Sequence, residues 1–211
     1  MKAANRRDAI VLAVLGIVPL LLFADVVCGI NAFYIRDMLH YHFPCKKILR
    51  EIVLGGHFPY WNPYFSAGQP MAANPAHEVF YPLTWLILLP DYLHALQLLP
   101  LVHIVIATLT MYALLRSMDI GRPAAALGAL SFGIGGLLCS MTSLLHFLFS
   151  ISWLPLTCLF TRRALLHRSI RDGVLAALFF ALQLLAGEPT TVLQTGLLLG
   201  MYAIYRGIKD H

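Results

Sequence analysis

The residues best suited to chemistry lie in a polar, aromatic-rich segment, residues 31–79, which interrupts an otherwise hydrophobic chain. Asp37 follows the first hydrophobic stretch closely, and a carboxylate at that position suits a general base or a metal ligand. The alternative is a solvated aspartate paired with Arg36 or Lys47. Glu188 lies in a Gly-Glu-Pro turn between the last two hydrophobic stretches, and it is a second carboxylate candidate.

A short amphipathic helix is predicted within the same segment. Pro44 suits the first turn of a helix, and the Gly55-Gly56 pair suits its end. Apolar residues recur at helical spacing on one face: Cys45, Ile48, Leu49 and Ile52. The opposite face carries basic residues: Lys46, Lys47 and Arg50. A helix of this kind lies flat on a membrane, where its basic face binds a lipid phosphate or is simply solvated.

Aromatic and amide side chains around the proline-rich part of the segment suggest a carbohydrate site. Candidates for contact with a sugar or an acceptor are His40, Trp61, Asn62, Tyr64 and Gln69. The alternative is an aromatic belt that packs against lipid headgroups. His40 and His42 would share a face only in an extended chain, and two histidines without a third ligand do not define a metal site. The sequence therefore predicts no specific metal ligands.

The composition indicates an integral membrane protein. Hydrophobic residues make up 59% of the 211 residues and charged residues 12%, against about 25% charged residues in soluble domains. Four cysteines show no paired spacing of the zinc or redox kind. About 20 apolar residues cross a bilayer as a helix. We therefore expect one transmembrane helical domain over residues 1–211, with six spans near 9–30, 95–115, 124–142, 144–161, 173–188 and 190–205.

The basic residues predict how these spans are oriented. With the N-terminus in the cytoplasm, 11 of the 15 basic residues fall on the inner side, and the other four lie in residues 31–79. This distribution follows the positive-inside rule and is not a nucleic-acid footprint, so no nucleic-acid partner is expected. Residues 31–79 are then extracytoplasmic, and residues 80–90 form an interfacial segment because they are too few to cross. The abrupt end at His211, soon after a hydrophobic stretch, suggests the N-terminal part of a longer protein.

Several motifs in residues 1–205 resemble one family of bacterial membrane proteins. These motifs are Arg36-Asp37, Phe43-Pro44, Gly56-His57-Phe58-Pro59-Tyr60-Trp61-Asn62-Pro63-Tyr64, Gly68-Gln69-Pro70, Asn74-Pro75 and Phe80-Tyr81-Pro82. They resemble the YfhO-like family, which is similar to the GT-C superfamily of polytopic glycosyltransferases. The resemblance implies an all-α helical bundle in which the first extracytoplasmic loop carries juxtamembrane helices and an essential acid, here Asp37.

The resemblance also implies an activity in the bacterial plasma membrane. A polyprenyl-phosphate sugar would be the donor, and a glycan, lipid or protein outside the cytoplasm would be the acceptor. Such enzymes use a pair of neighbouring acids, whereas Asp37 stands between Arg36 and Met38, so the use of a divalent metal, Mg²⁺ or Mn²⁺, stays open. The alternatives are a transporter or flippase of a lipid or glycan, and an inactive fragment or subunit.

Overall fold

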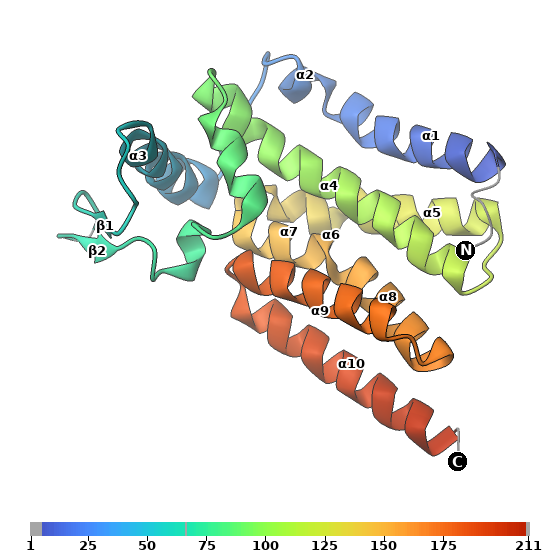
Figure 1. Cartoon of the computed structure of the whole chain (residues 1–211). Coiled ribbons are helices and arrows are strands. Elements are labelled where there is room, and N and C mark those ends of the chain that lie inside the picture. Colours follow the sequence, from blue (N-terminus) through green and yellow to red (C-terminus); the bar gives the residue numbers. More distant parts are fainter. Residues whose placement is uncertain (1–5, 66, 210–211) are drawn as a thin grey trace.

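The chain folds into a helical bundle, described by a computed structural model over residues 6–65 and 67–209 (Figure 1). Lys2, which contributes to the predicted charge distribution, lies outside the described residues. The α-helices are α1 (Arg6–Leu22), α2 (Ala24–Val27), α3 (Phe43–Leu54), α4 (Tyr92–Ser117), α5 (Arg122–Gly133), α6 (Gly136–Ser140), α7 (Leu145–Ser152), α8 (Leu154–His167), α9 (Ile170–Leu185) and α10 (Pro189–Lys209). Shorter elements are the π-helix η1 (Met38–His42), the 3-10 helices η2 (Pro75–His77), η3 (Pro82–Leu88) and η4 (Met141–Ser143), and the strands β1 (Trp61–Asn62) and β2 (Gln69–Pro70).

Helices occupy all six predicted hydrophobic stretches, which confirms the all-α class, but three of the stretches are broken. The first stretch divides at Phe23 into α1 and α2. The third divides between Gly133 and Gly136 into α5 and α6, and the fourth divides at Trp153 into α7 and α8. Glycine pairs weaken a helix, and Pro155 suits the first turn of a new one.

Helix α4 is the centre of the bundle. It packs against α1, α5, α7 and α8, and its buried residues run along most of its length (Figure 1). Within the described residues, two helical segments are long and apolar enough to cross a membrane: Tyr92–Ser117, which is α4, and Arg122–Ser143, which covers α5 to η4. Length and apolar composition are therefore sufficient for a bilayer crossing in two of the six predicted spans.

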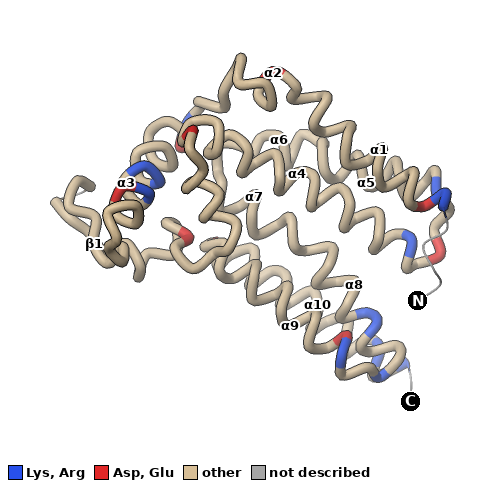
Figure 2. Tube along the Cα trace, turned by 45° about the horizontal axis from the view of Figure 1, so that its top comes forward, with Lys and Arg blue, Asp and Glu red and all other residues tan. Residues whose placement is uncertain are grey.

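Charged residues gather at the two ends of the bundle (Figure 2). Basic residues of α1, α4, α5, α8, α9 and α10 lie at the end that holds both termini, and those of α3 lie at the opposite end. The helices between the two ends carry almost no Lys, Arg, Asp or Glu. This arrangement agrees with the predicted separation of the basic residues into two groups.

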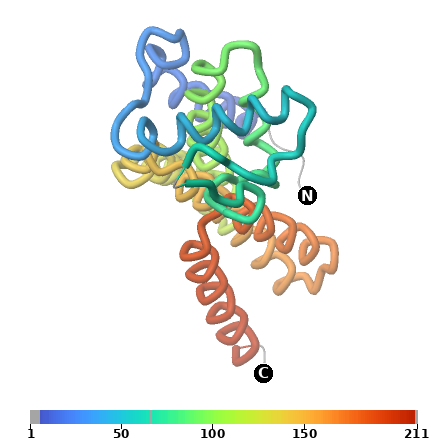
Figure 3. Tube along the Cα trace, turned by 90° about the vertical axis from the view of Figure 1, so that its left-hand side faces the viewer, coloured from blue at the N-terminus to red at the C-terminus, as the bar shows by residue number. Residues whose placement is uncertain are grey.

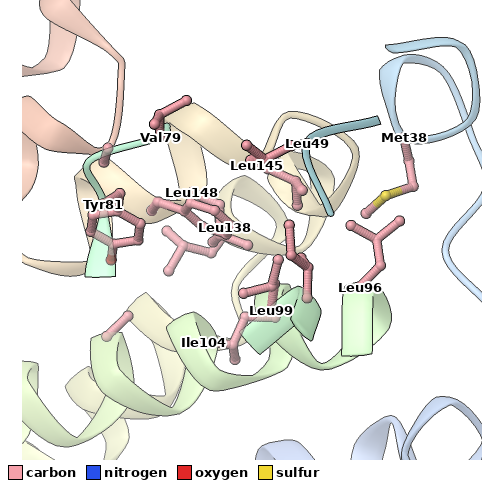
Figure 4. Close-up of a cluster of buried hydrophobic side chains, with 14 of the residues drawn as sticks. Met38, Leu49, Val79, Tyr81, Leu96, Leu99, Ile104, Leu138, Leu145 and Leu148 are labelled. Carbon is pink, nitrogen blue, oxygen red and sulfur yellow. The ribbon is translucent and has the colours of Figure 1, made fainter. Parts of the chain in front are cut away.

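The polar segment 31–79 packs against one end of the bundle (Figure 3). It contains η1, α3, the two-stranded sheet and η2. The strands are antiparallel, with Trp61 opposite Pro70 and Asn62 opposite Gln69. A hydrophobic core joins the segment to the bundle, with Met38 and Leu49 packed beside residues of α4, α6 and α7 (Figure 4).

The predicted interfacial segment 80–90 contains η3, and one of its aromatic residues is a core residue. Tyr81 is fully buried instead of lying at an interface. Its hydroxyl contacts His103 Nε2 at 2.6 Å and accepts a hydrogen bond from Trp153 Nε1 at 2.7 Å. Polar partners supplied by α4 and the Trp153 turn explain why this tyrosine can be buried.

Candidate functional site

Ionisable side chains from four helices, and from the residues that flank η2 and α10, converge where segment 31–79 meets the bundle. They are His42 of η1, Lys46 of α3, His77 of η2, Glu78, His146 of α7, and Glu188 before α10. Most of these side chains are almost completely buried. We call this set the buried polar cluster. Ionisable groups are rarely buried without a partner, so each of their contacts has to be accounted for.

A salt bridge between Lys46 and Glu78 is at the centre of the buried polar cluster. The two side chains are 1% and 0% exposed, and Lys46 Nζ also donates to the carbonyl of His77 at 2.6 Å. Burial raises the pKa of the Glu78 carboxyl, and the ammonium of Lys46 opposes that rise. Glu78 also adopts a left-handed backbone conformation, with φ of 50°, which is unfavourable for a residue other than glycine.

His42 is a neutral imidazole that is held by the first residue of α7. Burial, followed by the charge of Lys46, lowers its pKa to about 2. The Leu145 amide donates to His42 Nε2 at 3.2 Å, so the single proton of the neutral ring lies on Nδ1. His42 Nδ1 has no hydrogen-bond partner among the described residues.

His146 and Glu188 approach each other from α7 and the start of α10. His146 Nε2 lies 3.7 Å from Glu188 Oε2, and Glu188 Oε1 accepts a hydrogen bond from the Thr190 amide at 3.0 Å. Gly187 brings Glu188 close to η2, because its φ is 87° and a Cβ there would lie 2.2 Å from the Pro75 carbonyl oxygen. Only glycine fits this approach.

The geometry of three members of the buried polar cluster suits a metal ion. One ligand atom from each of His42, Glu78 and His146 lies within 4.8 Å of the other two. Coordination at His42 Nδ1 would move its proton to Nε2 and break the bond to Leu145. The Leu145 amide and the new Nε2–H of His42 would then both lack a partner, which costs about 2–6 kcal/mol in total. Zinc binding to four-ligand protein sites yields about 10–16 kcal/mol, so this rearrangement does not prevent coordination.

The two predicted carboxylates, Asp37 and Glu188, differ in their position relative to the buried polar cluster. Asp37 is exposed at the start of η1, and its charge acts on His146, so it lies at the edge of the buried polar cluster. Glu188 is a member of the cluster. The extended chain in which His40 and His42 would share a face does not form, because both lie in the π-helix η1, with His40 exposed and His42 buried.

The predicted basic face of α3 is only partly correct. Helix α3 begins and ends close to the predicted residues, and Lys47 is exposed. Lys46 is not on a solvated face, since it is buried against Glu78. Arg50 donates through Nε to the Ile87 carbonyl at 2.8 Å, and through Nη2 to the carbonyls of Leu89 and Pro90 at 3.2 Å. Arg50 therefore anchors α3 to the end of η3.

The residues predicted to contact a sugar divide into exposed and buried ones. Trp61 is 53% exposed and Tyr64 is 80% exposed, at the tip formed by the two strands. Asn62 is fully buried and accepts a hydrogen bond from the Tyr64 amide, so it supports the turn. Gln69 Nε2 lies 3.2 Å from His77 Nε2 and connects the strands to the buried polar cluster.

Sequence reasoning missed the central members of this site. His77, Glu78 and His146 are not among the candidate residues that the sequence suggested. No local pattern could have joined Glu78 and His146 to their partners, because Lys46 is 32 residues from Glu78 along the chain, and Glu188 lies in a different hydrophobic stretch from His146. Comparison of the chain with protein-family models, with curated proteins and with solved structures finds no match.

Proposed function

We propose that this protein is a membrane glycosyltransferase of the GT-C type. It transfers a sugar from a polyprenyl-phosphate donor to an acceptor outside the cytoplasm, which is a cell-envelope glycan, a lipid or a protein. The motif resemblance in segment 31–79 supports this proposal. The observation that carries it is an apolar groove that begins beside the buried polar cluster, because a lipid-linked sugar needs an apolar site and a polar site next to each other.

The apolar groove has a volume of about 400 Å³ and lies between α6, η4, α7, α8 and α10. Its lining residues are Leu137, Met141, Phe147, Ile151, Leu154, Thr190, Thr191, Gln194, Thr195 and Leu198. Phe147 directly follows His146, and the Thr190 amide donates to Glu188. An isoprenoid chain in the groove would therefore bring its phosphate toward the buried polar cluster.

The outer surface of the bundle favours a position within a bilayer. Large apolar side chains are exposed along α1, α9 and α10, among them Leu21, Leu178, Leu193 and Met201. Surfaces of this kind contact lipid or another protein. We place the chain in the bacterial plasma membrane with six spans, the N-terminus in the cytoplasm and segment 31–79 outside. The two charged ends would then lie at the two faces of the membrane (Figure 2).

In the proposed reaction, the Asp37 carboxylate accepts the proton of the acceptor hydroxyl as that oxygen attacks the anomeric carbon. The bond between the anomeric carbon and the phosphate oxygen breaks, and the polyprenyl phosphate leaves with the bonding electrons. Lys47 stabilises the departing phosphate. Lys46 is not assigned this role, because it is bound to Glu78. Trp61 and Tyr64 stack on the sugar or the acceptor from the exposed tip of the two strands.

Sugar transfer in proteoliposomes tests this function. The assay follows the transfer of labelled sugar from a polyprenyl phosphate to acceptors from the cell envelope. Asp37→Asn removes the proposed base and should lower the rate about 100-fold or more, within the range of general base catalysis. Glu51→Gln is the matched control, because Glu51 is also an exposed acid of segment 31–79 and should leave the rate unchanged.

Each result separates the proposed function from its rivals. Asp37→Asn with the rate of the wild type would refute the assignment of Asp37. Movement of the labelled lipid across the bilayer without sugar transfer would refute the enzyme and support a flippase. No transfer and no movement would support an inactive fragment or subunit.

A further inference from the structure

We propose that His42, Glu78 and His146 bind one divalent transition-metal ion, with zinc preferred. This site does not depend on the proposed sugar transfer. Zinc lies about 2.0–2.2 Å from nitrogen and oxygen ligands, so two ligands of a tetrahedral site are about 3.3 Å apart. The three ligand atoms here lie within 4.8 Å of one another. Movements of about 1.5 Å, available to side chains without refolding, are sufficient to close the site.

The hydrogen bonds within the cluster provide a second, independent argument. Each ligand residue has a buried polar atom without a hydrogen-bond partner among the described residues: His42 Nδ1, Glu78 Oε1 and His146 Nδ1. For two of the ligands a group on the far side stays in place when a metal binds: Lys46 holds the other oxygen of Glu78, and Glu188 lies beside the other ring nitrogen of His146. Metal ligands are commonly oriented in this way by a second group on their far side.

Charge also favours a cation at this position. Glu78 and Glu188 contribute two negative charges near the three ligand atoms, and Lys46 contributes one positive charge. The exposed Asp37 adds a further negative charge at the edge. Because Lys46 is bound to Glu78 Oε2, the other carboxylate oxygen is left for a metal without separating the ion pair.

The ligand types select the metal. Two imidazoles and one carboxylate match the His₂Glu set of catalytic zinc sites, which keep a fourth position for water or substrate. Magnesium prefers an octahedral set of oxygen ligands, so the site disfavours Mg²⁺, one of the two metals that the sequence leaves open. The side chain of His146 is 17% exposed, which gives the ion a route into the site.

The test measures zinc binding by purified protein in detergent after treatment with a chelator. Isothermal titration and elemental analysis of the dialysed protein should give one equivalent of Zn²⁺ per chain. His42→Gln, Glu78→Gln and His146→Gln each remove a ligand and should weaken binding more than 100-fold, whereas Glu188→Gln removes an orienting group and should weaken it about 10- to 100-fold. His57→Gln, at an exposed histidine of the same segment, is the matched control and should bind like the wild type.

Substoichiometric binding by the wild type would overturn the proposal, as would wild-type affinity in both His42→Gln and His146→Gln. Thermal unfolding of each variant without zinc identifies those that fail to fold. If all three ligand variants fail, Co²⁺ bound to the wild type decides: a four-coordinate visible spectrum supports the site, and a six-coordinate one overturns it. Zinc binding without sugar transfer would refute the proposed function and leave the metal site intact.

Discussion

Replacing Lys46 with methionine tests how segment 31–79 is held on the bundle. The substitution keeps the length of the side chain and removes the ammonium that pairs with Glu78 and donates to the His77 carbonyl. Removing one partner of a buried ion pair costs about 3–5 kcal/mol, because the other charge remains buried. Total stabilities are about 5–15 kcal/mol, so a large fraction of the stability should be lost.

The response of Glu78 limits the size of that loss. Burial already raises the pKa of its carboxyl, and Lys46 opposes the rise. Without Lys46, the carboxyl takes up a proton more readily and becomes neutral. We therefore expect a loss of about 3 kcal/mol, near the lower end of the range for a broken buried pair.

A double-mutant cycle isolates the interaction between the two residues. The assay is denaturant unfolding in detergent with a chelator present, followed by tryptophan fluorescence. Lys46→Met combined with Glu78→Leu removes both charges, and well-packed apolar replacements of buried pairs are often neutral or stabilising. Lys47→Met, at the exposed neighbouring lysine, should change stability by less than about 0.5 kcal/mol. A Lys46→Met variant as stable as Lys47→Met, or a double variant whose loss is the sum of the single losses, would refute the buried pair.

Two further predictions concern the histidines of the buried polar cluster and the glycine turn beside it. Lowering the pH from about 6.5 toward 4 should destabilise the fold by up to about 1.4 kcal/mol per pH unit for each histidine. Burial holds the pKa of His42 at about 2 and that of His77 at about 4, so the unfolded chain binds protons that the folded chain excludes. His42→Gln should flatten unfolding curves measured across this window, and an unchanged slope would contradict the buried neutral ring. Gly187→Ala should cost more than about 1 kcal/mol in thermal unfolding, because its φ is positive and the Pro75 carbonyl leaves no room for a Cβ. Gly200→Ala, in open space on α10, should be neutral or stabilising, and equal stability of the two variants would contradict the tight approach.

Local signals predicted the elements well, and distant contacts explain the errors. Pro44 and Gly55 placed α3 almost correctly, because capping preferences act within a few residues. The same helix shows the limit of periodicity, which placed Lys46 on a basic face that would bind a lipid phosphate or be solvated. Its partner Glu78 is 32 residues further along the chain, and no pattern in α3 reports its approach.

The sequence singled out the segment that contributes to the candidate site, but not most of the residues that form it. Segment 31–79 contributes His42, Lys46, His77 and Glu78 to the buried polar cluster, and the second carboxylate candidate, Glu188, is also a member. His42 was considered only with its near neighbour His40, since spacing along the chain compares residues that are close in sequence. Its geometric partners are Glu78 and His146, which tertiary folding alone brings together.

The two charged ends of the bundle differ in how their polar groups are paired. At the end near the termini, Asp8 accepts hydrogen bonds from Tyr112, Arg116 and Arg122, and all three donors are matched to one carboxylate. These hydrogen bonds hold α1 against α4 and α5, and they give no indication of a ligand site.

The opposite end contains a buried ion pair, the left-handed backbone of Glu78 and the tight approach of Gly187, and several ligand-type atoms there have no hydrogen-bond partner within residues 6–65 and 67–209. An apolar core of the same shape would be at least as stable, so stability does not account for these features. Strain and unpaired polar atoms that gather at one place are typical of a binding site. The apolar groove beside the buried polar cluster gives such a site an amphiphilic neighbour, which is the reason to look for its ligand among lipid-linked molecules.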